Sequence, residues 1–150
     1  MTTIAYDGNG KIATDGRCCR GSTIINDNFV KQKIVNDVQF YFSGSTADID
    51  AIVNSYFGAE LTLKTEINAL VIDGGNLFLI GPDDENKTVW ACSQDLNEPN
   101  TIGSGADHAL TAMDVGCTAK EAIEFAIKRD SGSGGTIRVY DIKTGEEVEG

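Results

Sequence analysis

Residues 1–16 read MTTIAYDGNGKIATDG, two short strand-like runs on either side of a tight turn. The runs are residues 3–6 and 11–14. The Asp-Gly and Asn-Gly steps between them supply the positive φ angles that tight β-hairpins need. The chain is therefore predicted to open with a β-hairpin that starts directly behind Thr2.

Thr2 is the residue in this stretch with catalytic potential. If Met1 is removed, Thr2 carries both a hydroxyl and a free α-amine, and the terminal amine can activate a threonine oxygen as a nucleophile. The α-amine has a reference pKa of about 7.7–8.0, which is close to the pH where a general base works best. Any protein can begin with Met-Thr, so a catalytic role needs support from the rest of the chain.

Beyond the hairpin, β-rich and helical segments alternate. The predicted strands are residues 23–25, 29–35, 38–42, 67–72, 76–80, 88–92 and 136–140. The predicted helices are residues 47–57, residues 106–113 and the segment opened by the capping box Thr118-Ala119-Lys120-Glu121. This order predicts one domain over residues 1–150, with sheets covered by helices on both outer sides.

Composition excludes several function classes. The chain has a formal net charge of -11, which disfavours nucleic acid because phosphates need lysine and arginine opposite them. No apolar run approaches the length of a membrane span, and the start of the chain lacks the basic and apolar regions of a signal peptide. We therefore expect a cytoplasmic protein with no nucleic-acid or membrane partner.

The four cysteines do not form a metal site in the sequence. Cys18 and Cys19 are neighbours, Cys92 and Cys117 are isolated, and the single His108 has no partner at ligand spacing. Reduced thiols and no metal or other cofactor are the expectation.

Four clusters, in addition to Thr2, carry groups suited to catalysis. They are Thr14-Asp15-Gly16, Lys31-Gln32-Lys33-Ile34, Ile102-Gly103-Ser104-Gly105 and the run from Arg129-Asp130 through Ser133 to Gly135. Each alone is ordinary, since Asp-Gly marks a turn and Gly-Ser-Gly a loop. Their occurrence together, in this order behind an N-terminal threonine, favours a shared active site.

On these residues the chain resembles the proteasome β-subunit family, and in particular its compact, HslV-like members. Residues 2–4 look like the family's mature N-terminus, residues 12–21 like its second strand and turn, and residues 42–48 like the glycine turn that opens its first helix. The resemblance implies an N-terminal-nucleophile (Ntn) hydrolase of α+β class, an αββα sandwich of two antiparallel sheets between helical layers. One helical layer is expected to be reduced, because residues 44–67 have room for a single helix.

The resemblance also implies roles for individual residues. Thr2 would be the nucleophile, and Asp15 would form an ion pair with a lysine beside it. Ser104, Asp130 and Ser133 would hydrogen-bond the α-amine. In this resemblance the position of the oxyanion donor matches Tyr41, and Cys19 stands where the family often has a threonine that binds substrate backbone.

The identity of the lysine is ambiguous. Lys33 precedes Ile34, as the family pattern prefers, whereas counting without gaps from Asp15 points to Lys31. Both have the same parity in a strand, so alternation does not separate them. We favour Lys33.

The expected function is a threonine-type endopeptidase that degrades peptides or unfolded proteins. The resemblance implies other copies of the chain as partners in a homo-oligomer, with a ring as one form, and an unfoldase ATPase as a further candidate partner. Two alternatives stay open: a non-catalytic assembly subunit of the same family, and an Ntn amidase acting on a small amide.

The first prediction concerns the N-terminus. A catalytic Thr2 needs a free amine, so the intact mass of the purified protein is expected to be lower than that of the full chain by one methionine. A protein that retains Met1 would have no free amine at Thr2 and would contradict catalysis by this residue.

Overall fold

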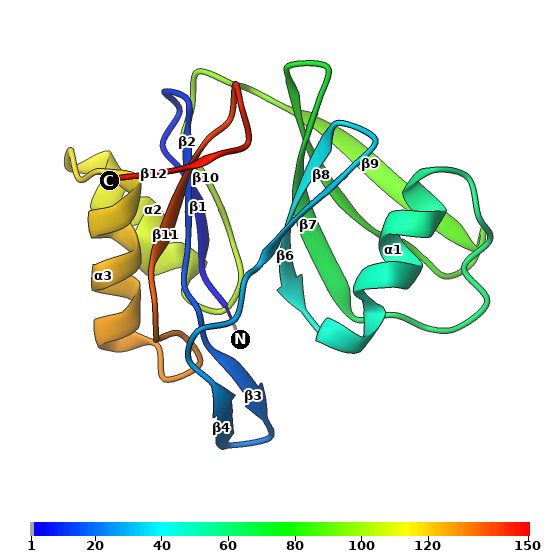
Figure 1. The fold of residues 1–150 in the computed structure, drawn as a ribbon, viewed down its shortest axis with the longest axis horizontal. Coiled ribbons are helices and arrows are strands. Elements are labelled where there is room, and N and C mark those ends of the chain that lie inside the picture. The colour runs from blue at the N-terminus through cyan, green and yellow to red at the C-terminus, as the bar shows by residue number, and fades with distance from the viewer. Residues whose placement is uncertain (1) are drawn as a thin grey trace.

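The computed structural model describes residues 2–150, and Met1, whose removal is predicted above, lies outside them. Two five-stranded antiparallel sheets form the centre of the described structure (Figure 1). The first sheet has the order β10-β1-β2-β11-β12. Its strands are β1 (Ile4–Tyr6), β2 (Lys11–Thr14), β10 (Asn100–Ile102), β11 (Arg138–Asp141) and β12 (Glu147–Val148).

The second sheet has the order β5-β6-β7-β8-β9, so each strand pairs with its neighbour in sequence. Its strands are β5 (Gln32–Val35), β6 (Val38–Gly44), β7 (Ile67–Asp73), β8 (Asn76–Asp83) and β9 (Thr88–Gln94). A third, two-stranded sheet of β3 (Cys18–Arg20) and β4 (Thr23–Asn26) projects from the body of the molecule (Figure 1).

The helices are short. A 3-10 turn, η1 (Thr46–Asp48), leads into α1 (Ile49–Tyr56), which packs on the second sheet. The helices α2 (Ala106–Asp114) and α3 (Ala119–Arg129) pack on the first sheet. The predicted capping box of α3 is confirmed, since Thr118 Oγ1 accepts from the Glu121 N–H and the Glu121 side chain accepts from the Thr118 N–H.

The core has three parts. Small side chains such as Ala5, Ala13 and Ala122 bring α2 and α3 close to the first sheet. Larger ones fill the space between the first and second sheets, including Ile4, Tyr6, Ile12, Tyr41, Leu70, Ile72 and Leu77. Under α1, Ile52 and Val53 pack against Phe40 and Val71. The burial of both β1 and β6 on their two faces explains why these strands read as apolar runs.

The predicted fold class, an α+β Ntn αββα sandwich, is wrong. The structure is mostly β, with twelve strands in three antiparallel sheets against three short α-helices. Residues 44–67 hold the single helix that was expected, α1, so the difference lies in short strands that were not predicted, such as β10 and β12. In addition, residues 18–26 form their own small sheet instead of joining a larger one.

No helix among the described residues is both long enough and apolar enough to cross a membrane.

The packing of α1 gives a stability prediction. Ile52 is fully buried under the second sheet, so Ile52→Ala is expected to lower the free energy of unfolding by about 2–5 kcal/mol. Asn54→Ala, on the exposed side of the same helix, is the control and should change it by less than about 0.5 kcal/mol. Urea unfolding followed by circular dichroism measures both. Equal stability of the two variants would show that α1 does not contribute to the core.

Candidate active site

Thr2 and Thr3 lie directly before β1, and Thr2 lines a pocket. Thr3 is fully buried, and its carbonyl accepts a hydrogen bond from Asp15 N–H at 3.2 Å. This bond continues the ladder in which Ile4 pairs with Thr14. The opening hairpin therefore places Asp15 directly across from Thr3, as the hairpin prediction implies.

Asp15 is fully buried, and each of its carboxylate oxygens accepts hydrogen bonds. Oδ1 accepts from the backbone N–H of Thr3 at 3.1 Å and from Lys31 Nζ at 2.5 Å. Oδ2 accepts from the backbone N–H of Gly134 at 3.0 Å. The carboxylate therefore connects the opening hairpin, the start of the second sheet and the loop after α3. Hydrogen bonds to a charged group are stronger than those between neutral groups, so these connections are strong.

Lys31 is the lysine at the site. It is 4% exposed, and its Nζ donates to Asp15 and, at 3.0 Å, to Oγ1 of Thr2. Its carbonyl accepts from Phe42 N–H at 3.0 Å, which fixes Lys31 at the entry to the β5–β6 pair. Burial lowers the pKa of Lys31 below its usual value, and the charge and hydrogen bond of Asp15 oppose that shift.

The choice of Lys33 over Lys31 is wrong. Lys33 lies on the surface, where its Nζ pairs with the exposed Asp50 at 2.7 Å. The two lysines share a strand face, but two residues along a strand are separated by roughly 7 Å. That spacing moves Lys33 away from Thr2 and over the first turn of α1.

A second cluster surrounds the backbone nitrogen of Thr2. This nitrogen donates to Ser104 Oγ at 3.1 Å, and Ser104 Oγ donates to Asp130 Oδ2 at 2.6 Å. Ser133 Oγ donates to the same Asp130 oxygen at 2.7 Å. Of the three residues predicted to hydrogen-bond this nitrogen, Ser104 contacts it directly, whereas Asp130 and Ser133 are linked to it through Ser104.

Ser133 also contacts Thr3, which the sequence did not indicate. Thr3 Oγ1 and Ser133 Oγ are 2.7 Å apart, and because the Ser133 hydroxyl proton points to Asp130, Thr3 is the donor. Burial raises the pKa of Asp130, but hydrogen bonds from Ser104, Ser133 and the Gly132 N–H outweigh it, so the pKa lies below its usual value. Asp130 is therefore an anion at neutral pH.

Glycine is required beside Thr2 for steric reasons. Gly103 has a φ of 101°, and a Cβ at this position would collide with the carbonyl of Thr2. At Gly105 a Cβ would collide with Thr3 Oγ1. The Gly-Ser-Gly sequence is thus explained by close approach of the loop to the first strand, which brings Ser104 into hydrogen-bonding range.

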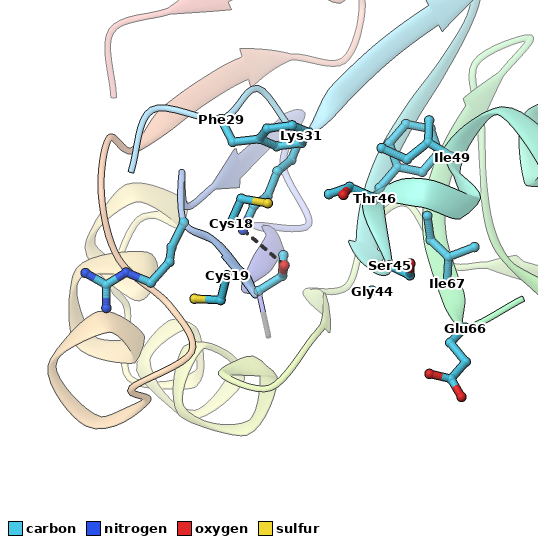
Figure 2. Close-up of a pocket in the computed structure, with 13 residues that line it drawn as sticks. Cys18, Cys19, Phe29, Lys31, Gly44, Ser45, Thr46, Ile49, Glu66 and Ile67 are labelled. Atoms are coloured by element: carbon cyan, nitrogen blue, oxygen red, sulfur yellow. Dashed lines mark hydrogen bonds between the residues drawn. The ribbon is translucent and has the colours of Figure 1, made fainter. Parts of the chain in front are cut away.

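The pocket in front of Thr2 has a volume of about 350 Å³. Figure 2 shows its two walls, with Cys18, Phe29 and Lys31 on one side and Ser45, Thr46, Ile49 and Ile67 on the other. Cys19, in the expected substrate-backbone position, also lines it. Its lining mixes apolar side chains with charged and hydroxyl groups.

Tyr41 is not at the pocket, contrary to its match with the oxyanion position. Its ring is fully buried between the sheets, and its hydroxyl donates to Gln39 Oε1 at 2.6 Å. Gly44, three residues along β6, lines the pocket together with Thr2. With a φ of 127° and no room for a Cβ, Gly44 is the residue that sequence reasoning missed. In the sequence, the position of Gly44 directly before Ser45-Thr46 could have indicated a special backbone conformation there.

The four cysteines all lie within the described residues 2–150. Cys18, Cys19, Cys92 and Cys117 are free thiols there, and no group of three or more potential ligands from His, Cys, Asp or Glu is gathered in residues 2–150.

Many solved structures resemble this fold, and two of them are compared with it here. Both are of BPH from Thiobacillus denitrificans, one of them in complex with epoxomicin. Each is 17% identical to this chain with a TM-score of 0.63, and each alignment covers 93% of this chain and 97% or 96% of the other. At this identity the likeness concerns the fold alone. No family model matches the chain, and no curated protein matches it in sequence.

The buried ion pair gives a prediction that does not depend on activity. Lys31→Met leaves the Asp15 carboxylate buried without its cation, so the free energy of unfolding is expected to fall by about 3–5 kcal/mol. Lys33→Met, which breaks only the exposed pair with Asp50, should cost less than about 1 kcal/mol. Chemical denaturation measures both. If the Lys33 variant is the less stable one, the assignment of Lys31 is wrong.

Proposed function

We propose that the protein is a threonine-type peptidase that uses Thr2, freed by removal of Met1, as its nucleophile. The observation that carries the proposal is the hydrogen bond from Lys31 Nζ to Thr2 Oγ1, at 3.0 Å in a pocket and backed by buried Asp15. This arrangement fits the proteasome β-subunit, HslV-like resemblance of the sequence.

Lys31 acts on the nucleophile through its charge. An ammonium beside a hydroxyl stabilises negative charge that develops on the oxygen as its proton leaves. The same charge disfavours protonation of the nearby α-amine, so more of the amine is free to act as base. Asp15 holds Lys31 in place and balances its charge. This pairing offsets the free-energy cost of burying the cation in a low-dielectric site.

Ser104 and Asp130 orient the base. Ser104 Oγ accepts a hydrogen from the Thr2 nitrogen while donating to Asp130, so the hydroxyl proton cannot turn toward the amine. The nitrogen lone pair is left for the Thr2 hydroxyl proton. Ser133 acts indirectly on the base, because its hydrogen bonds hold Asp130 and Thr3 in position.

The reaction follows the two-step course of covalent catalysis. Thr2 Oγ1 bonds to the peptide carbonyl carbon, the α-amine takes the hydroxyl proton, and that proton passes to the leaving amine as the C–N bond breaks. Water then attacks the ester, the bond between the acyl carbon and Thr2 Oγ1 breaks to release the carboxylic acid, and Thr2 Oγ1 takes up a proton that water supplies. We assign the oxyanion donor to the Gly44 N–H in place of Tyr41, because Gly44 lines the pocket and Tyr41 is buried elsewhere.

The pocket supports an endopeptidase acting on an extended peptide or an unfolded protein. Phe42, Ile49 and Ile67 offer apolar contact, and Ser45 and Thr46 offer polar contact near the reacting hydroxyl. A BPH of similar fold has been solved in complex with epoxomicin, which supports epoxomicin as a probe for this chain. A homo-oligomer and an unfoldase ATPase partner are part of the proposal and rest on the sequence resemblance.

A non-catalytic assembly subunit would not need this network. Keeping the Asp15–Lys31 pair on one side of Thr2 and the Ser104–Asp130 pair on the other costs stability, because buried charges are expensive even when paired. The network therefore favours an enzyme.

The test is covalent labelling by epoxomicin, followed by intact mass. The wild-type protein is expected to gain one ligand per chain, and Thr2→Ala none, because the attacking oxygen is gone. Thr111→Ala, an exposed threonine on α2, is the matched control and should label as wild type does. Equal labelling of Thr2→Ala and wild type would exclude Thr2 as the nucleophile.

A further inference from the structure

The loop of residues 131–135 follows α3 and takes part in both halves of the site. On one side, its Gly134 N–H donates at 3.0 Å to the buried carboxylate of Asp15, the partner of the active-site lysine. On the other side, its Ser133 Oγ donates at 2.7 Å to the carboxylate of Asp130. A shift of this loop would therefore disturb the anion that holds the cation and the anion that holds the base at the same time.

The two glycines at the end of this loop are explained by what lies against them. A Cβ at Gly134 would collide with the guanidinium of Arg17. Gly135 has a φ of 75°, and a Cβ there would collide with the carbonyl of Asp27. The catalytic residues alone do not require glycine at either position, so the Gly-Gly step indicates that the loop is packed closely against Arg17 and Asp27.

Arg17, which lies between β2 and β3, joins this loop to the end of β4. Its Nε and Nη2 donate to the two carboxylate oxygens of Asp27 at 2.8 Å and 3.2 Å, and its Nη1 donates to the carbonyl of Ser131 at 3.2 Å. The backbone of Asp27 holds the other end of the loop, because its carbonyl accepts from Thr136 N–H at 2.8 Å. A planar guanidinium can serve a carboxylate and a carbonyl at once, whereas an ammonium lacks this fork of donors.

We propose that Arg17 is a positioning residue for the peptidase reaction. Held by Asp27, its guanidinium fixes the loop of residues 131–135, and the loop aligns the hydrogen bonds on either side of Thr2. The inference rests on the proposed function, because the groups that it aligns are the nucleophile and base of that mechanism. Arg17 also lines the pocket, so a direct contact with the substrate is the alternative role that a test has to separate.

The pair of Arg17 and Asp27 is suited to local positioning more than to global stability. Its side chains are 20% and 44% exposed, and ion pairs that water can reach contribute little to the free energy of unfolding. The hydrogen bonds from Arg17 hold the pKa of Asp27 below its usual value, so the pair is charged at neutral pH. Loss of Arg17 is therefore expected to shift the loop in a protein that stays folded.

The kinetics of labelling by epoxomicin test the role in the reaction. Arg17→Gln is expected to lower the maximal rate constant of labelling by about 10- to 100-fold, because small misplacements of reacting groups are costly. The half-saturating epoxomicin concentration should stay within about two-fold of wild type. Arg17→Lys, which keeps the charge without the fork, should not restore the rate. Arg20→Gln, an exposed arginine on β3, is the matched control and should label as wild type does.

A double-mutant cycle tests whether Asp27 acts through Arg17. Asp27→Asn is expected to lower the maximal labelling rate constant, and the double variant Arg17→Gln/Asp27→Asn should lose no more than Arg17→Gln alone, because the two side chains act as one unit. Additive losses would show that they act independently, which contradicts the proposal.

Amide hydrogen exchange tests the loop without any reaction. In Arg17→Gln the Gly134 N–H is expected to lose protection, whereas the amides of β7 keep theirs. Wild-type protection of Gly134 in this variant, or a raised half-saturating concentration with an unchanged maximal rate constant, would overturn the proposal. A wild type that epoxomicin does not label would instead overturn the proposed function, and the exchange of Gly134 would still decide whether Arg17 holds the loop.

Discussion

The ion pair between Lys31 and Asp15 is the interaction on which the rest of the site depends. It joins three segments that are far apart in the chain, because Asp15 also accepts from the backbone of Thr3 and of Gly134. A carboxylate with 0% exposure and a lysine with 4% exposure are costly to bury. The cost is offset only if each charge faces the other and the remaining oxygen lone pairs accept backbone hydrogens. Thr2 Oγ1 sits against the cation as a consequence of this arrangement.

Asp130 has the corresponding role on the other side of Thr2. Two hydroxyls, Ser104 and Ser133, donate to one of its oxygens, and Gly132 N–H donates to the other. The loops that follow β10 and α3 are thereby fixed against the first strand. A cation therefore lies at the side-chain oxygen of Thr2, and a serine held by an anion lies at its nitrogen. The proposed mechanism uses this arrangement, because in it the oxygen loses a proton and the nitrogen accepts one.

Much of this site could be predicted from the sequence, because turn chemistry is local. The Asp-Gly and Asn-Gly steps gave the opening hairpin, the hairpin placed Asp15 opposite Thr3, and the capping box located α3. The lysine could not be predicted, since Lys31 and Lys33 share a strand face and only the end of the strand decides which one reaches Thr2. The prediction of an αββα class was wrong because the structure has additional short strands, such as Cys18–Arg20 and Asn100–Ile102. These strands lack strong periodicity, so no local sequence pattern predicts them. Tyr41 was misassigned because both faces of its strand are buried. The sequence of such a strand does not indicate which of its residues lies next to a cavity.

The central claim is that the Lys31 cation acts electrostatically on the amine and hydroxyl of Thr2. The most direct measurement is an NMR titration of the Thr2 α-amine in protein carrying ¹⁵N-labelled threonine, compared between wild type and Lys31→Met under conditions where near-UV circular dichroism shows both folded. The account predicts a lower amine pKa in the wild type, because the neighbouring ammonium disfavours the protonated amine. The same amine pKa in both proteins, or the absence of a free amine at Thr2, would contradict it.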